Sequence, residues 1–245
     1  MVISGRIVLA CSMVLVILMG SDLALAGPPK PGLVLWLDAE NPASVTMDTA
    51  GMVRQWSDQS GRGNHARQPR SGAQPEYLID GIGGKPALGF DGGDFLTLGQ
   101  PDDLAFLPGR SHTIVAVYDL PKVNLGTIIA RGGGGAEARA CHLYLTPDKV
   151  GAIASGVRKE APAGAGPGVV AQLCDGDRMD VQHNGHNCMT FRAGKVASDV
   201  DVLIGARRET ADNLGVSWLL KGSLAEILVY DRALPPPELE QVYRH

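Results

Sequence analysis

The sequence predicts an all-β fold, an antiparallel sandwich or barrel formed as a single domain. Short apolar or alternating runs recur along the chain, and each is bounded by Gly, Pro, Asn or Asp. No helical pattern of about ten to fifteen residues separates these runs, which argues against βαβ units. The chain has 32 glycines and only 5% aromatic residues, a composition typical of many turns between short strands.

Residues 1–26 have the pattern of a signal peptide. Arg6 precedes an apolar run from Ile7 to Met19, and Ala24–Ala26 supplies small residues for cleavage. The run is short for a membrane span, so we expect a secreted, periplasmic or cell-surface protein with no membrane span after cleavage. Two alternatives stay open: an uncleaved anchor, and a lipid-modified Cys11, although most of the apolar run follows that cysteine.

A proline-rich lead-in, residues 27–32, joins this leader to the predicted domain, residues 33–245. Proline fixes φ and lacks an amide donor, which discourages regular structure there. The remaining chain is long enough for one β-sandwich with a sizeable core. Its net charge of −4 and the lack of a basic stripe argue against a nucleic-acid partner.

The predicted strands follow the lead-in as short runs between turn residues. They are Leu33–Leu37, Ala87–Phe90, Thr113–Tyr118, Thr127–Ala130, His142–Leu145, Val150–Ala154, Val202–Ile204 and Leu224–Tyr230. Trp36 and Trp56 lie in apolar strand patterns and are predicted core residues. One helix is expected at the C-terminus, because Pro235–Pro237 precedes Glu238–Tyr243 and places proline at the helix start.

Two hairpin turns organise the middle of the chain. Asp175-Gly176 and Asn184-Gly185 are typical two-residue turns, so we expect three consecutive antiparallel strands around them. These strands are Val169–Cys174, Asp177–His183 and His186–Phe191.

That arrangement restricts the disulfide bonds available in an oxidising compartment. Cys174 and Cys188 would lie on outer strands about 9.6 Å apart, beyond the limit of about 7 Å between the Cα atoms of a bridge. If a bridge forms, it is therefore predicted to join Cys141 to either Cys174 or Cys188.

Several longer segments occur in a recognisable order. They are Gly32–Ala39, Gln55–Ala66, Lys85–Leu96, the hairpin ending in His183–Gly185, and Gly222–Leu234. Together they resemble the concanavalin A-like, laminin G-like jelly rolls of secreted bacterial proteins, from about Leu33 to Tyr243. The resemblance implies a jelly-roll sandwich of two curved antiparallel sheets, one face of which often holds carbohydrate in relatives. This superfamily includes lectins, adhesion domains and glycosidases, so the fold does not identify the ligand.

Three aspartates are candidate calcium ligands, and calcium is the cofactor that the sequence leaves open. Asp58 and Asn64 could bind the ion, or they could accept backbone hydrogen bonds in a tight turn. Asp91 and Asp94 flank two glycines and present the same two alternatives. Because calcium needs six to eight oxygen ligands and no dense acidic spacing is present, the turn interpretation is favoured at each position.

Trp218 is the candidate ligand-binding residue. It follows the polar stretch Glu209–Asn213 and could lie on an exposed face where a sugar ring stacks. Burial in the core is the alternative, because a tryptophan removes a large area from water when it is buried.

Catalytic motifs are lacking. A glycosidase needs two carboxylates about 5 to 10 Å apart, and the Glu-x-Asp-x-Glu pattern of jelly-roll glucanases is missing. Glu226 and Asp231 are five residues apart and so point to opposite faces of a regular strand. The sequence therefore predicts a non-catalytic exported module that binds carbohydrate or a surface protein. A polysaccharide hydrolase or lyase with a site assembled from distant strands, and a structural domain without a small ligand, are the alternatives.

Overall fold

A computed structural model of the chain describes residues 27–121, 125–134, 138–210, 212 and 215–245. The predicted signal peptide, residues 1–26, lies outside this part. Among the described residues, no helix has the length and apolar character needed to cross a membrane.

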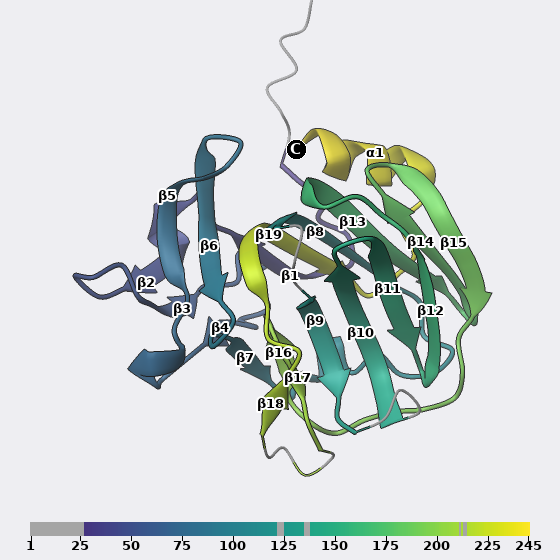
Figure 1. Ribbon diagram of the computed structural model, residues 1–245. Helices are drawn as coiled ribbons and strands as arrows, with labels where there is room; N and C mark the ends of the chain where they lie inside the picture. Colours follow the sequence, from purple (N-terminus) through teal and green to yellow (C-terminus); the bar gives the residue numbers. More distant parts are fainter. Residues whose placement is uncertain (1–26, 122–124, 135–137, 211, 213–214) are drawn as a thin grey trace, which may run out of the picture.

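Two antiparallel sheets pack face to face, and they confirm the predicted all-β sandwich (Figure 1). In the first sheet, β1 (Leu33–Asp38) pairs with one end of β19 (Lys221–Tyr230), and β6 (Lys85–Asp91) pairs with the other end. The order of the remaining strands in this sheet is β15 (His186–Arg192), β14 (Arg178–His183), β13 (Gly166–Asp175), β8 (His112–Leu120), β19 (Lys221–Tyr230), β6 (Lys85–Asp91) and β5 (Glu76–Ile82). We call it the β8 sheet.

We call the second sheet the β10 sheet, and it contains most of the shorter strands. Its order is β12 (Val157–Pro162), β11 (Lys149–Ala154), β10 (Arg139–Thr146), β9 (Gly126–Gly132), β16 (Val202–Ile204), β7 (Leu96–Gly99), β4 (Ala66–Arg67), β3 (Val53–Trp56) and β2 (Val45–Met47). A small ribbon is formed by β17 (Arg207–Arg208) and β18 (Val216–Ser217). The helical segments are α1 (Pro236–Arg244) and the 3-10 turns Pro42–Ser44, Ser71–Ala73 and Asp102–Leu104.

Strand alternation in β10 shows how the sequence divides core from surface. Cys141, Leu143 and Leu145 belong to the main hydrophobic core between the sheets. His142 and Tyr144 alternate with them and therefore lie on the outer face of the β10 sheet. This outer face carries the candidate site described below.

Both predicted hairpins are present, but the first turn is Gly176-Asp177 rather than Asp175-Gly176, because Asp175 pairs with Arg178. β14 lies between β13 and β15, and His183 is directly opposite His186 across the second turn. Asn184 and Gly185 have φ values of +50° and +78°, as a two-residue turn with two left-handed positions requires. The C-terminal helix is also present, as α1.

All three cysteines of the domain are free, so the predicted bridge from Cys141 to Cys174 or Cys188 is not formed. Each sulfur instead lies against a different partner. The Gln172 side-chain amide donates to Cys141 Sγ at 3.6 Å. Cys174 and Cys188 each donate to a backbone carbonyl, at 3.4 and 3.3 Å. Each of the three cysteine sulfur atoms therefore makes a hydrogen bond with a group other than a second sulfur.

Helix α1 covers the outer face of the β8 sheet, where Leu239 and Val242 pack in a second hydrophobic cluster. Trp36, predicted as a core residue, is only partly buried and packs against this second cluster rather than in the main core. The reason is alternation in β1, whose core positions are Leu35 and Leu37. Trp56 is fully buried in the main core, as predicted.

Candidate functional site

Trp218 lies half-buried between β18 and β19, over the outer face of the β10 sheet. Its φ of +54° is in the left-handed region, which a bulky residue rarely adopts. Its carbonyl accepts a hydrogen bond from the Thr127 amide of β9 at 3.3 Å. The indole is therefore placed against β10 rather than between the sheets.

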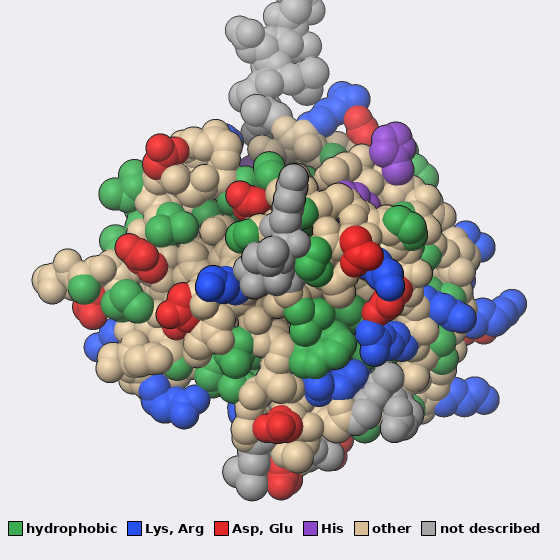
Figure 2. All heavy atoms as spheres, viewed as in Figure 1, with side chains coloured by type: hydrophobic (Ala, Val, Ile, Leu, Met, Phe, Trp, Pro, Cys, Tyr) green, Lys and Arg blue, Asp and Glu red, His purple; other side chains and the backbone are tan. Residues whose placement is uncertain are grey.

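Two buried rings of β10 support the indole. The Tyr144 and Trp218 ring centroids are 5.2 Å apart with an edge-on angle of 78°, and the His142 and Trp218 centroids are 5.5 Å apart. His142 and Tyr144 are fully buried, whereas Trp218 keeps part of its surface in solvent. Figure 2 shows hydrophobic side chains bordered by Lys and Arg side chains over this region of β9, β10 and β17.

Two arginines contact the indole from different strands. The Arg207 guanidinium carbon, on β17, is 4.9 Å from the Trp218 ring centroid, and that of Arg158, on β12, is 5.5 Å away. These distances are in the range of cation–π interactions. Burial lowers the pKa of Arg207, the charge of Glu209 opposes that shift, and the charge of Arg158 adds to it.

A short hydrogen-bonded chain fixes the polar edge of the site. The Tyr144 hydroxyl donates to Glu160 Oε1 at 2.6 Å and accepts from Arg158 Nε at 2.7 Å. The hydrogen bond from Tyr144, followed by one from an Arg158 terminal nitrogen to the same Glu160 oxygen, lowers the pKa of the Glu160 carboxyl. Burial raises the pKa of the Tyr144 hydroxyl, which therefore stays protonated. The Arg158 and Glu160 side chains are 43% and 26% exposed, so both a donor and an acceptor are accessible beside the indole.

Asp58 does not have the free oxygens that a calcium ligand needs. Its Oδ1 accepts from the Trp36 and Ser60 amides at 2.9 and 2.8 Å. Its Oδ2 accepts from the Ser60 hydroxyl at 2.8 Å and the Asn64 amide at 3.0 Å. Protein donors contact both oxygens, which favours the turn interpretation of Asp58 over calcium binding.

Asp91 and Asp94 lie together at the end of β6. Asp94 Oδ2 accepts from the Asp91 amide at 2.8 Å, and Asp91 Oδ1 accepts from the Gly93 amide at 2.6 Å. Burial, with the neighbouring Asp91 charge, raises the pKa of Asp94 to about 6. Asp58 does not join them, and the described residues contain no group of three His, Cys, Asp or Glu side chains suited to a metal ion.

Sequence reasoning missed a pair of carboxylates on the outer face of the β8 sheet. Asp38 on β1 is directly opposite Glu226 on β19, a register that places Cβ atoms about 5 Å apart. Glu226 Oε1 accepts from the Trp36 indole at 2.8 Å, and burial raises its pKa to about 7. The adjoining pocket measures about 160 Å³, which is smaller than the roughly 300 to 1,000 Å³ of ligand pockets.

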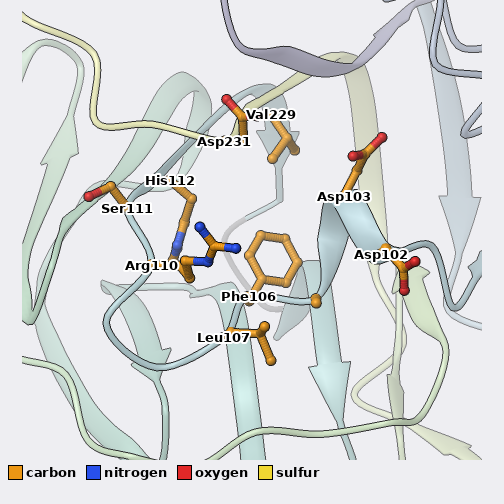
Figure 3. A pocket seen from close by; sticks show the side chains of 10 residues that line it. Asp102, Asp103, Phe106, Leu107, Arg110, Ser111, His112, Val229 and Asp231 are labelled. Carbon is orange, nitrogen blue, oxygen red and sulfur yellow. The ribbon is translucent and has the colours of Figure 1, made fainter.

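A second pocket, of about 200 Å³, lies between the chain after the third 3-10 turn and β8 (Figure 3). Phe106 forms its centre and contacts the His112 ring edge-on at 5.1 Å. Burial lowers the pKa of His112 to about 4, so this imidazole is neutral. Phe106 is only 7% exposed, so its ring offers little surface for stacking, unlike Trp218.

Comparison with known proteins places this geometry on a familiar scaffold. No protein-family model and no curated protein matches the sequence. The binding domain of Paraclostridial Mosquitocidal Protein 1 matches 87% of this chain with a TM-score of 0.60 and 12% identity, and this chain spans 52% of that one.

Two similar structures are complexes with carbohydrate. Domain 4 of the Geobacillus stearothermophilus arabinanase AbnA, bound to arabinotriose, has a TM-score of 0.58 at 13% identity and covers 86% of this chain and 98% of its own. The CBM40 of Ruminococcus gnavus IT-sialidase, bound to α2,3-sialyllactose, has a TM-score of 0.50 at 20% identity and covers 64% of this chain and 95% of its own. The chain is thus a β-sandwich domain structurally similar to carbohydrate-binding modules and other binding domains.

Proposed function

We propose that this chain is an exported, non-catalytic, laminin G-like module that binds carbohydrate on the outer face of the β10 sheet. The observation that carries the proposal is the half-exposed Trp218 indole, held by two buried rings and bordered by Arg158 and Glu160. A sugar ring presents apolar C–H groups and hydroxyls. The indole can contact the former, while the guanidinium and the carboxylate exchange hydrogen bonds with the latter.

The chemistry of the site favours binding over catalysis. Tyr144 and Glu160 are hydrogen bonded, but the Tyr144 side chain is fully buried and cannot reach a substrate. The Asp38 and Glu226 pair lies on the opposite sheet beside a pocket too small for a polysaccharide. Relatives in fold that hold arabinotriose and sialyllactose support a carbohydrate ligand.

The test is Trp218→Ala, measured by glycan array and then by calorimetry with the glycans retained. We expect affinity to fall about tenfold or more, because losing roughly 1.4 kcal/mol of contact corresponds to a factor of ten. Trp218→Phe keeps a ring and should bind with intermediate affinity. Ile79→Ala is the matched control, because Ile79 is 78% exposed and lies on β5 in the other sheet.

Thermal unfolding of each variant separates loss of binding from loss of folding. An array that stays blank for the wild type, with and without calcium, would remove the proposal and leave a protein partner as the function to examine. Unchanged binding by a folded Trp218→Ala variant would show that the sugar lies elsewhere.

A further inference from the structure

We infer that the carbohydrate ligand carries a carboxylate, so that the module selects acidic polysaccharides, such as those built from uronic acids, over neutral ones. This inference rests on the function proposed above and concerns the same site.

The site is positively charged in a protein whose net charge is −4. Arg139, Arg158 and Arg207 all lie close enough to the buried His142 ring for their charges to lower its pKa, in addition to the larger effect of burial. Lys149 adds a further cation, 3.7 Å from Glu160. Glu160 is shared by Lys149 and Arg158, so one carboxylate faces two cations. A local excess of one charge on a protein of opposite net charge favours a ligand of complementary charge.

Arg207 is a partly buried cation on which the charge of Glu209 acts, but it forms no ion pair with a described residue. Its Nη1 donates to the Gly134 and Arg208 carbonyls at 3.2 and 3.3 Å, and its buried Nε lacks a hydrogen-bond acceptor there. No carboxylate of the described chain lies within ion-pair distance of it. A half-buried guanidinium beside a second guanidinium is destabilised by burial and by like charge, and a bound anion would relieve both effects.

The indole holds these two charges in fixed positions. Both guanidinium carbons lie within 5.5 Å of the same Trp218 centroid. Arg158 is held further by Tyr144 and Glu160, which engage its Nε and one terminal nitrogen. The planar fork of arginine matches a carboxylate better than it matches a hydroxyl, and charge-assisted bonds are about twice as strong as neutral ones. A carboxylate on a sugar at Trp218 would therefore be selected over a hydroxymethyl group.

The experiment compares acidic polysaccharides with their own methyl esters, which keep the sugar backbone and remove the charge. Polygalacturonate, alginate and hyaluronan are each used in both forms, with dextran sulfate as a general polyanion. Binding is measured by affinity electrophoresis and calorimetry at low and moderate salt. We expect at least one acid to bind about tenfold or more tightly than its ester, and dextran sulfate to bind weakly.

Arg207→Gln is the informative variant, and Arg62→Gln is its matched control, because Arg62 is exposed in a loop far along the chain from this site. Arg207→Gln should lose about tenfold in affinity for the acid and none for the ester, while Arg62→Gln should bind as the wild type. Arg158→Gln serves as a second variant if Arg207→Gln unfolds.

Equal affinity for every acid and its ester would overturn the inference. So would strong binding to dextran sulfate that Arg207→Gln leaves unchanged. If acids and esters bind equally and Trp218→Ala abolishes both, the proposed function stands and the inference fails. If nothing binds on the array or here, the proposed function itself fails.

Discussion

Glu226 is a carboxyl group that folding brings into a poorly hydrated position. Burial raises its pKa from 4.5 to about 7, helped by the charges of Asp38 and Glu40 and opposed by the Trp36 hydrogen bond and by Lys85. His245 Nε2 lies 3.6 Å from the same carboxyl, at the end of α1. The pKa of Glu226 is higher in the folded protein than in the unfolded chain. Protonated Glu226 therefore contributes stability to the folded state that is fully present below about pH 4.5 and is lost as the pH rises through about 7.

We therefore expect Glu226→Gln to be more stable than the wild type at high pH. Glutamine keeps an oxygen for the Trp36 indole and carries no charge to bury. The advantage should be near zero at pH 4.5 and reach roughly 2 to 3 kcal/mol above pH 8. Urea unfolding of both proteins at pH 4.5, 6 and 8.5 measures it. A difference that is constant across this range would show that Glu226 does not titrate as described.

At the scale of one element, Asp58 organises the turn between β3 and β4. Its two oxygens receive hydrogen bonds from Trp36, Ser60 and Asn64, so the turn is joined to β1 as well as closed on itself. Asp48 makes a simpler turn, with Oδ1 accepting from the Ala50 and Met52 amides on an exposed loop.

Asp58→Ala should lower the free energy of unfolding by roughly 2 to 4 kcal/mol, because it leaves several partly buried donors without acceptors. Asp48→Ala is the control and should lower it by about 1 kcal/mol or less, since water can replace an exposed acceptor. Urea unfolding gives both values, and adding calcium should not separate wild type from Asp58→Ala. Equal effects of the two substitutions would contradict the assigned role of Asp58.

Some elements and part of the site could be predicted from the sequence. Apolar runs such as Thr113–Tyr118 are buried on both faces, so composition alone identifies them as strands. β12 was missed because it is an edge strand whose side chains are mostly exposed and charged. Trp218 could be proposed because a tryptophan after a polar stretch is conspicuous.

The partners of Trp218 could not be predicted in the same way. Tyr144, Arg158 and Arg207 come from three strands, and only the pairing of those strands brings them together. β17 itself is two residues long and gives no periodic signal. The Asp38 and Glu226 pair likewise depends on the register between β1 and β19, which joins the two ends of the domain.

At the scale of the whole molecule, the domain is held together without a covalent cross-link between its described cysteines. Its stability therefore comes from the core between the sheets and from the α1 cluster. Burial raises the pKa of Cys141 to about 12 and that of Cys174 to about 11. Both thiols are thus poor nucleophiles while the protein is folded.

Alkylation without reductant tests this account of the thiols. Under denaturing conditions, we expect mass spectrometry to find Cys141, Cys174 and Cys188 all modified. In the native protein, Cys141 should react slowest because it is fully buried. Reductant should leave the melting temperature unchanged. Protection of any two cysteines from alkylation after unfolding would reveal a bridge.

The two ends of the described chain meet on the α1 side of the sandwich. The Gln241 side chain of α1 donates to the Gly27 carbonyl at 3.1 Å. The Trp218 indole packs on Tyr144 of β10, in the opposite sheet. A tether attached at either end would therefore leave the domain on the α1 side. The face that carries Trp218 would then point away from the tether. A surface carrying many copies would display the Trp218 faces to the medium, where several weak contacts with one long polymer add up to strong retention.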